Sequence, residues 1–319
     1  MALVALVTGT STGIGEATAL HLARNGYRVF ASMRNTGAGE QMAKTAVSEN
    51  LALTLLQQDV CDPESNRKAV SDVLAEAGNI DVLVNNAGIG GGLAFEETTT
   101  QALREIMETN FFGAVDLTQQ VLPHLRAQKS GCILNVSSVS GVMAFSPQMP
   151  YAASKWALEA VSEVLAMEMK AFNVRVALIE PGVILTPIFE KGGTDPSPDS
   201  PYLKFYQRML RVFEAALKQP SMPIAVAETI LNAIETDDPK LRYLVGPDAI
   251  ALMNGRRSMS AATRSTCRSV VFVAAVLSIS SVKSTEITNP TDKRLATKKL
   301  SMPAPAPRSM TTSSPASFR

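Results

Sequence analysis

A tyrosine and a lysine stand four residues apart in a stretch of helical spacing, so Tyr151 and Lys155 project from one helix face. A phenol with a pKa of about 10 is a weak acid–base catalyst at neutral pH, and a nearby ammonium favours its phenolate. Ser137 and Ser138 directly follow an expected strand, Cys132 to Val136, where either hydroxyl can bond a substrate oxygen. Neither serine has an adjacent histidine, which argues against a hydrolase nucleophile. These residues predict proton transfer at an oxygen atom.

A glycine-rich segment, Thr8-Gly9-Thr10-Ser11-Thr12-Gly13-Ile14-Gly15, lies between the first expected strand and the first expected helix. Glycines at such a turn let the backbone approach a pyrophosphate and let the helix pack against the strand, while the helix N-terminus offers N–H groups to phosphate oxygens. This setting favours a nucleotide-binding loop over a purely structural turn. Its candidate coenzyme contacts are Gly9, Ser11, Thr12, Gly13, Ile14 and Gly15.

The residues after the second expected strand indicate which coenzyme the loop prefers. An acidic side chain about 20 residues beyond the glycines would bind both hydroxyls of the adenosine ribose, but the chain reads Ala31-Ser32-Met33-Arg34 there. A guanidinium can pair with a ribose 2′-phosphate, so Arg34 predicts NADP over NAD unless it is a solvated surface residue. Asp59 and Val60, after the third expected strand, are placed to contact adenine, although Asp59 is equally suited to cap the next helix.

Two asparagine positions complete the set of polar candidates. Asn110 lies inside an expected helix, where asparagine is unusual, and it could hold a water, orient Lys155 or simply face solvent. The segment Asn85-Asn86-Ala87-Gly88 ends the fourth expected strand at the edge where ligands of parallel sheets bind, or it forms only a turn.

The elements that must position these residues follow a regular alternation. Short β-branched or leucine-rich runs alternate with stretches of helical spacing from residue 2 to about 245, which predicts an α/β protein with a doubly wound parallel sheet covered on both faces. The expected strands are Ala2–Val7, Tyr27–Ser32, Leu51–Gln57, Ile80–Asn85, Cys132–Val136, Arg175–Ile179 and Arg242–Val245. The expected helices are Gly15–Arg24, Glu64–Glu76, Gln101–Arg126, Tyr151–Lys170 and Ala225–Glu235.

Residues 187–223 interrupt this alternation, with six prolines around an amphipathic segment from Tyr202 to Leu217. We expect a loop-and-helix insertion that covers the substrate, because loops of this length are usually functional or disordered; the alternative is a surface connection.

The composition changes near residue 256. Residues 1–255 carry 19 basic and 27 acidic side chains, whereas residues 256–319 carry 11 basic and 2 acidic ones, together with 21 serines and threonines and 5 prolines. We therefore expect a domain over 1–255 and a basic tail over 256–319 that is either disordered or the product of a frameshift. A basic localisation tail is the competing explanation.

Length and composition set outer bounds on function. A chain of 319 residues with 46% hydrophobic residues can bury one large core. Its net charge of +1 gives no reason to expect a nucleic acid partner, and three distant cysteines with two histidines argue against a disulfide framework or a bound metal. The N-terminus lacks a signal peptide, and no apolar run is long enough to span a membrane, so we expect a cytoplasmic protein.

Together these motifs resemble the short-chain dehydrogenase/reductase family over roughly residues 2–245. The glycine spacing, Asn86-Ala87-Gly88, Asn110, Ser138, the Tyr151–Lys155 pair and Pro181-Gly182 with Thr186 occur in the family's order. The resemblance implies a Rossmann fold and a catalytic tetrad of Asn110, Ser138, Tyr151 and Lys155, with Ser138 preferred over Ser137 for its separation from the tyrosine.

The resemblance also implies a role for each residue. Tyr151 would exchange a proton with the substrate oxygen, which Ser138 would hold, while hydride moves to or from the nicotinamide. Lys155 would lower the tyrosine pKa and bind the nicotinamide ribose, and Asn110 would retain a water in a proton relay. Coenzyme contacts implied in addition to the glycine-rich loop are Arg34, Asp59, Val60, Asn86, Ala87, Gly88, Tyr151, Lys155, Pro181, Gly182, Val183 and Thr186.

Within the family, Ala31-Ser-Met-Arg34 and Tyr151-Ala-Ala-Ser-Lys155-Trp-Ala-Leu-Glu159 are similar to the hydroxysteroid and retinol dehydrogenase branch. The expected activity is NADP-dependent interconversion of an alcohol and a ketone or aldehyde on a bulky apolar substrate, by a homodimer or homotetramer. A catalytically idle NADP-sensing protein is the alternative, which the intact Ser138, Tyr151 and Lys155 disfavour. A sugar-nucleotide epimerase is disfavoured by the glycine spacing.

Overall fold

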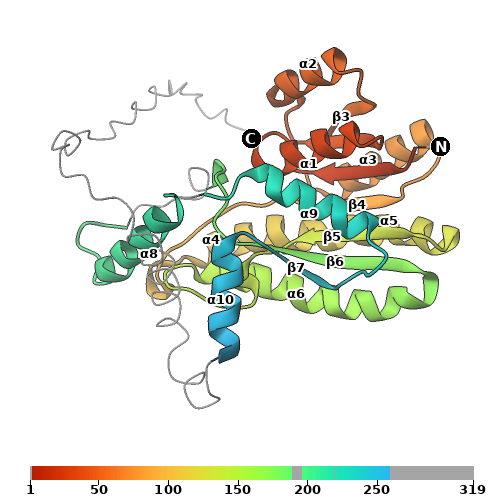
Figure 1. The fold of residues 1–319 in the computed structure, drawn as a ribbon. Helices are drawn as coiled ribbons and strands as arrows, with labels where there is room; N and C mark the ends of the chain where they lie inside the picture. The colour runs from red at the N-terminus through yellow and green to blue at the C-terminus, as the bar shows by residue number, and fades with distance from the viewer. Residues whose placement is uncertain (1, 189–195, 219, 259–319) are drawn as a thin grey trace, which may run out of the picture. The chain divides into compact units, whose positions relative to one another are not determined.

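A computed structural model describes residues 2–188, 196–218 and 220–258 of the chain (Figure 1). The predicted parallel sheet is present, and each expected run of apolar residues forms one of its strands. The residues of the central strands are all buried. All seven strands pair in parallel, in the order β3 (Leu53–Gln57), β2 (Arg28–Met33), β1 (Val4–Thr8), β4 (Val82–Asn85), β5 (Gly131–Val136), β6 (Val174–Pro181) and β7 (Arg242–Val245).

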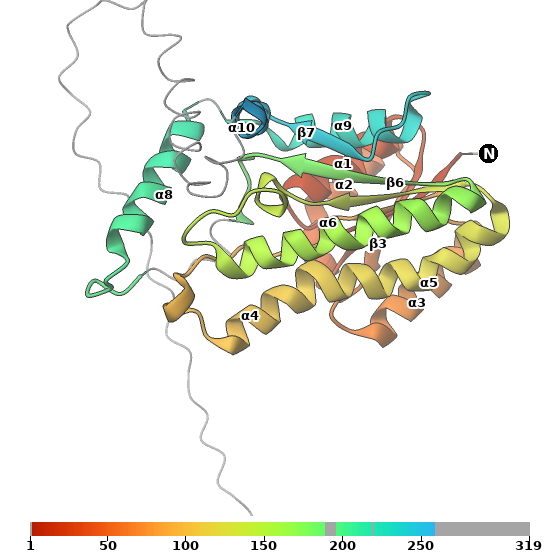
Figure 2. The same ribbon diagram turned by 90° about the horizontal axis from the view of Figure 1, so that it is seen from below.

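Helices cover both faces of the sheet, as its two-sided apolar character requires. On one face α1 (Gly13–Arg24) and α9 (Pro223–Glu235) pack beside each other over a core that includes Leu22, Val29 and Ile230. On the other face lie α3 (Pro63–Ala77), α5 (Gly113–Gln128) and α6 (Met149–Met169), which are drawn below the sheet in Figure 2, with α1 and α9 above it. The strand order reverses between β1 and β4, and ligands of such sheets bind at the carboxyl edge of that point.

Two helices of the structure were not expected from the sequence. Helix α2 (Glu40–Ser48) follows a 3₁₀ turn over Thr36–Gly39, where two glycines weaken any helical pattern. Helix α10 (Pro247–Ser258) follows β7 directly and runs past the domain boundary expected at residue 255. Its first helical residue is Pro247, a helix-start signal in the sequence.

The single helix expected over 101–126 is divided. It consists of α4 (Thr100–Met107), a π turn over Glu108–Phe112, and α5. A π turn places one extra residue in the helix, and it is a frequent feature of functional sites. Asn110 is at its centre.

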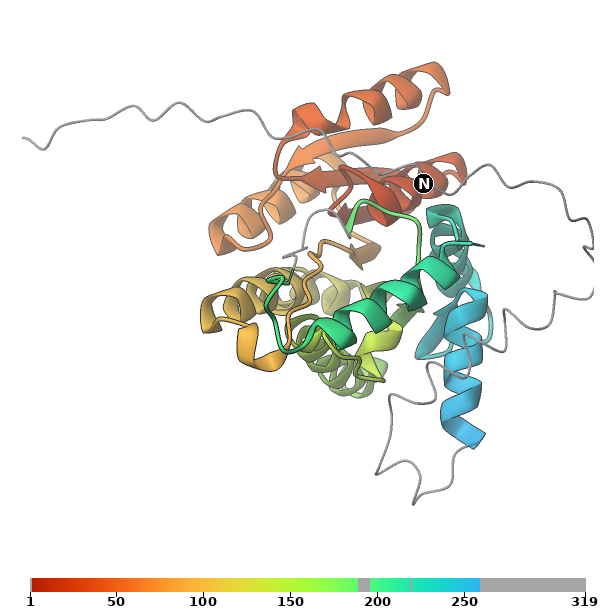
Figure 3. The ribbon, with the colours of Figure 1, turned by 90° about the vertical axis from the view of Figure 1, so that its left-hand side faces the viewer.

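The amphipathic segment expected within the insertion forms α8 (Leu203–Ala216), which buries Tyr206, Met209 and Val212. Figure 3 shows α8, in green, lying across one end of the sheet. The lid prediction also covers residues 189–195 and 219, which lie outside the described residues.

The described core ends with α10, so we expect that deleting residues 259–319 leaves a folded protein with unchanged coenzyme affinity. Deleting from Pro247 onward should instead destabilise the fold by about 3 kcal/mol or more, because Ala249 and Leu252, at 0% and 1% exposure, leave the core. Urea unfolding and coenzyme titration of both truncated proteins measure the difference. Loss of folding in the shorter deletion would show that residues 259–319 belong to the core; those residues lie outside the described part of the chain.

Candidate active site

The glycine-rich loop forms a cradle at the carboxyl end of β1. Gly9 and Gly13 have φ of +69° and +68°, a backbone conformation that other residues rarely adopt. A Cβ on Gly9 would lie 2.6 Å from the Cα of Ala87, so glycine is also required by the close approach of the segment after β4. Helix α1 begins at Gly13 and turns its N-terminal N–H groups toward this loop. The loop thus has the shape and the donors that a pyrophosphate requires.

Asn86 fastens the segment after β4 to this cradle. Its Nδ2 donates to the carbonyl oxygens of Thr8 and Gly9, at 2.8 and 3.2 Å. The backbone N–H groups of Asn86 and Ala87 both donate to Thr8 Oγ1 at 3.0 Å. The segment is therefore fastened directly to the glycine-rich loop.

Ser138, Tyr151 and Lys155 come together beside this segment. Ser138 follows β5 and hydrogen-bonds the Tyr151 phenol, and its Oγ also accepts from the Ser140 N–H at 3.1 Å. The Lys155 ammonium lies 5.7 Å from the centroid of the Tyr151 ring and donates to the Val136 carbonyl oxygen at 2.8 Å. Phenol, hydroxyl and ammonium therefore share one edge of the sheet, as the spacing predicted.

Burial changes the proton affinities of this group. Removal of solvent raises the pKa of Tyr151, and the hydrogen bond from Ser138 opposes that rise. Burial lowers the pKa of Lys155 to about 8, against the opposing charge of Glu159. A lysine that titrates near 8 can change its charge close to neutral pH. The lowering of the tyrosine pKa by Lys155, which the resemblance implies, stays a prediction.

Asn110 faces inward from the π turn, at 1% exposure, so the solvent-facing alternative is wrong. Its Oδ1 accepts from the Ile89 N–H at 2.8 Å, and its Nδ2 donates to the Ile89 carbonyl oxygen and to Ser154 Oγ. Ser154 in turn donates to the Tyr151 carbonyl oxygen at 2.8 Å. A Cβ on Gly88 would lie 3.3 Å from Asn110 Oδ1 and 3.8 Å from Lys155 Nζ. Gly88 therefore lies directly beside both of these side chains.

The adenosine end of the expected coenzyme site is more open. Arg34 is exposed at the end of β2, and among the residues that the structure describes no carboxylate forms an ion pair with it. Asp59 Oδ1 accepts from the Cys61 N–H, while Asp62 caps α3 through the Glu64 N–H, so the capping role considered for Asp59 is wrong. Val60 packs against Gly113 at the start of α5.

The segment Pro181–Thr186 leaves β6 toward the cradle. Thr186 lies beside Gly13, with its Cγ2 3.1 Å from the position that a Cβ on Gly13 would take. The N–H of Val183 donates to Asp248 Oδ2 at 2.7 Å. Asp248 was not among the residues expected from the sequence, although the helix-start residue Pro247 just before it is a signal that could have directed attention there.

Helix α8 is tied to the loop after β4. Tyr206 Oη accepts from the Ala94 N–H at 2.7 Å and donates to Glu97, and Tyr202 donates to Glu96. These bonds join residues more than a hundred positions apart, so no local sequence pattern could reveal them. On its buried side Met209 belongs to an apolar cluster with Val139, Met143, Phe145, Ala249 and Leu252. Helix α8 therefore rests on the apolar segment that follows Ser138.

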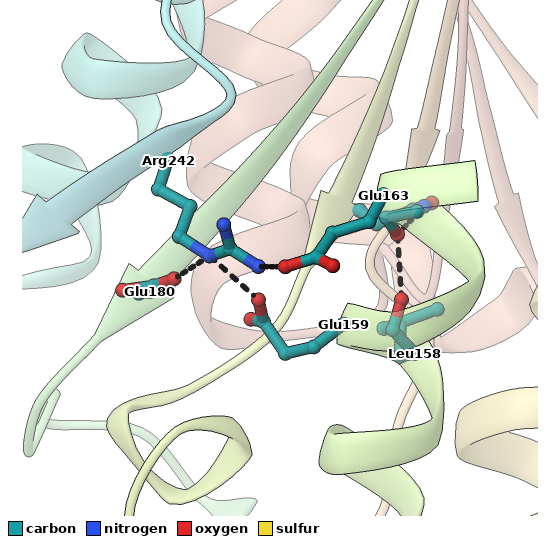
Figure 4. A network of polar contacts seen from close by, with 7 residues as sticks. Leu158, Glu159, Glu163, Glu180 and Arg242 are labelled. Carbon is teal, nitrogen blue, oxygen red and sulfur yellow. Dashed lines mark hydrogen bonds and ion pairs between the residues drawn. The ribbon is translucent and has the colours of Figure 1, made fainter. Parts of the chain in front are cut away.

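Arg242 ties α6, the helix that carries Tyr151 and Lys155, to the last two strands of the sheet. Figure 4 shows Arg242 of β7 between three carboxylates: its Nε lies 3.0 Å from both Glu159 and Glu180, and Nη2 bonds Glu163. Glu180 and Glu159 are 1% and 5% exposed. Glu159 lies one helical turn beyond Lys155, so this cluster fixes α6 to β6 and β7.

Arg242→Met should destabilise the protein by about 2 kcal/mol at pH 7, less than for a wholly buried pair because a third of the Arg242 side chain is exposed. The loss should shrink at pH 5. Burial raises the pKa of Glu159, so the folded state of the variant takes up protons more readily than the unfolded state and gains stability as pH falls.

Urea unfolding at both pH values measures this loss. Arg28→Met is the matched control, because it breaks a more exposed pair with Glu76 and should change stability little. An Arg242→Met loss that does not depend on pH would contradict the carboxylate explanation.

The described residues fit a dinucleotide coenzyme. Along the carboxyl edge of the sheet lie, in succession, a glycine cradle that a Cβ would fill, the N-terminus of α1 and the polar residues that follow the strands. The same part of the chain contains no group of three or more histidine, cysteine, aspartate or glutamate side chains able to hold a metal ion. No helix within it is both long and apolar enough to cross a bilayer.

Comparison with known proteins gives a consistent result. A family model described as short chain dehydrogenase matches residues 3–196. The chain is 34% identical to a 3-ketodihydrosphingosine reductase of Bacteroides thetaiotaomicron (76% of this chain, 88% of the relative) and 36% identical to human retinol dehydrogenase 8 (74% and 79%). It is 33% identical to mouse 17-beta-hydroxysteroid dehydrogenase type 1 (75% and 72%). A solved short-chain dehydrogenase from Streptomyces avermitilis superposes with a TM-score of 0.73 at 36% identity (80% and 92%).

Proposed function

Because the chain belongs to the short-chain dehydrogenase/reductase family, an oxidoreductase family, we propose that it interconverts an alcohol and a ketone or aldehyde with NADP as coenzyme. The proposed substrate is bulky and apolar. The observation that carries the proposal is the hydrogen bond between Ser138 and the Tyr151 phenol, with the Lys155 ammonium beside the ring and the glycine cradle along the same edge.

The residues of the chain divide the chemistry among them. The bound coenzyme supplies or accepts the hydride. Tyr151 gives a proton to the carbonyl oxygen during reduction and takes one from the alcohol during oxidation. Ser138 orients that oxygen, because its hydroxyl already lies within hydrogen-bonding reach of the phenol. Lys155 supplies a positive charge that stabilises the phenolate, and Asn110 holds the loop after β4 in place and retains a water for proton relay.

Two features support a bulky apolar substrate. The lid helix and the segment after Ser138 meet in an apolar cluster, whose members include Met143, Phe145 and Met209. The relatives named above act, by their names, on a ketosphingoid base, a retinol and a hydroxysteroid, all of which are large and mostly apolar. For the coenzyme, the support is Arg34, an exposed guanidinium at the position where NAD-binding proteins carry a carboxylate.

A coenzyme-oxidation screen tests the proposal. Purified protein is incubated with NADPH or NADH and with steroid, retinoid, long-chain keto-lipid and small aromatic carbonyls, and absorbance at 340 nm is followed. We expect turnover with NADPH on one of the large apolar classes. Tight coenzyme binding without turnover on any carbonyl or alcohol would favour the NADP-sensing alternative, whereas a preference for small polar carbonyls would refute the substrate class.

We also propose that the protein is a homodimer or homotetramer located in the cytoplasm. The support for self-association is a row of exposed apolar residues along α6, where Trp156, Val164 and Met167 are 38%, 49% and 69% exposed. Burial of such a row stabilises a helix–helix interface. Sedimentation equilibrium of the wild type and of Met167→Glu measures the assembly.

A further inference from the structure

Three hydrogen bonds to later parts of the chain hold the backbone that follows β6. The Gly182 N–H donates to the Val245 carbonyl oxygen at 2.9 Å, and the Leu185 N–H donates to the Ser221 carbonyl oxygen at 3.0 Å. Between these two bonds lies Val183, whose N–H is taken by a side chain rather than by backbone. That side chain is Asp248, from the first turn of α10.

Asp248 fills the space beside Gly182. A Cβ built on Gly182 would collide with all three atoms of the Asp248 carboxyl group. Gly182 does not have a positive φ, so its backbone conformation would accept alanine. It is therefore the carboxylate contact that requires glycine at this position. Gly182 and Asp248 therefore pack directly against each other, and the Val183 N–H donates to the same carboxylate at 2.7 Å.

Helix α10 holds the carboxylate in place. Asp248 lies near the N-terminus of α10, where a negative charge is favourable. Ala249 and Leu252 of α10 are buried in the apolar cluster that also contains Val139 and Met143. The helix that positions Asp248 is thus packed on the segment that follows the catalytic Ser138.

We propose that Asp248 is a positioning residue, which fixes the backbone of Gly182 and Val183 so that it can receive the nicotinamide half of the coenzyme. The inference rests on the proposed function, which places the nicotinamide beside this segment. Asp248 acts through Val183 and does not itself touch the coenzyme. Its removal should therefore weaken binding of the nicotinamide half and leave binding of the adenosine half unchanged.

Titration of Asp248→Ala with two ligands tests this. NADPH and 2′-phospho-ADP-ribose differ by the nicotinamide ring, and NADH with ADP-ribose replaces the pair if the wild type prefers NADH. We expect Asp248→Ala to bind NADPH about tenfold more weakly, the effect of one lost charge-assisted hydrogen bond. The fragment should bind as it does to the wild type, which also shows that the variant is folded. Asp248→Asn is the matched control, because it keeps an acceptor for Val183 and should bind NADPH nearly as the wild type does.

Gly182→Ala tests the same contact from the other side and remains informative if Asp248→Ala fails to fold. The added methyl group must displace the carboxylate, so NADPH binding should weaken while fragment binding does not change. In Gly182→Ala/Asp248→Ala the methyl group has room, and the combined loss should be smaller than the sum of the two single losses.

The outcomes separate this inference from the proposed function. A wild type that binds neither coenzymes nor fragments overturns the proposed function and the inference with it. A wild type that binds NADPH, with Asp248→Ala binding it equally well, overturns the role of Asp248 alone. Equal losses for NADPH and the fragment would show a general structural effect and would also overturn it.

Discussion

Tyr151→Phe is expected to lower kcat about a thousandfold with the best substrate from the screen, while the affinity for NADPH changes less than about twofold. The phenol is the proposed proton donor, and general acid catalysis by a positioned side chain contributes about 10²- to 10⁴-fold. Phenylalanine keeps the ring beside the Lys155 ammonium and removes only the hydroxyl that bonds Ser138. Steady-state kinetics and fluorescence titration of NADPH give the two quantities.

Tyr243→Phe is the matched control, because the Tyr243 hydroxyl accepts from the exposed Lys240 N–H away from the site. It should leave kcat unchanged. Wild-type turnover in Tyr151→Phe would falsify the assignment of the proton donor.

Lys155→Ala separates the two roles proposed for the lysine. The ammonium is buried and donates to Val136, close to the segment that carries Gly88. We expect both kcat and NADPH affinity to fall, in contrast to Tyr151→Phe, because Lys155 is proposed to bind the nicotinamide ribose as well as to stabilise the phenolate. If only kcat changes, Lys155 does not bind the coenzyme.

The second large effect concerns the coenzyme. Arg34→Ala should lower the ratio of kcat/KM for NADPH to that for NADH by about ten- to a hundredfold, since a charge-assisted pair with the 2′-phosphate is lost. Arg126→Ala, which removes an exposed arginine in the last turn of α5, should leave the ratio unchanged. Both variants are measured at low ionic strength, because salt weakens exposed pairs.

A wild type that prefers NADH, or an unchanged ratio in Arg34→Ala, would place coenzyme selectivity elsewhere. An acidic replacement at Met33 is a poorer test. Met33 is 4% exposed and packs at Gly39 and Leu55, so a carboxylate there would be buried without a partner and would destabilise β2.

Local patterns in the sequence were enough to predict the sheet and which candidate residues lie at its carboxyl edge. The Tyr151–Lys155 pair depends only on helical spacing, and the glycine-rich loop depends only on its place between a strand and a helix. Parallel strands put their carboxyl ends at one edge, which is why the sequence alone places Asn86, Ser138 and Pro181 close together.

Contacts between distant segments could not be predicted in this way. The bond from Val183 to Asp248 and the bond from Tyr206 to Glu97 depend on how β7, α10 and α8 fold back over the site. The π turn at Asn110 leaves no pattern in residue type beyond an asparagine in a helix interior. Helix α2 was missed because Gly37 and Gly39 precede it.

The π turn also limits which insertions and deletions the helix pair α4 and α5 can accept. An α-helix advances about 100° per residue, so one extra residue would rotate α4 against α5 by about that angle if the π turn over 108–112 did not absorb it in a single widened turn. Deleting one residue from the turn would restore α geometry and leave α4 and α5 in register, but it would remove the widened turn that holds Asn110 against Ile89. Length variation should therefore be tolerated in the loops on either side of this helix pair but not within the turn, whose five residues fix the position of Asn110 beside the loop after β4.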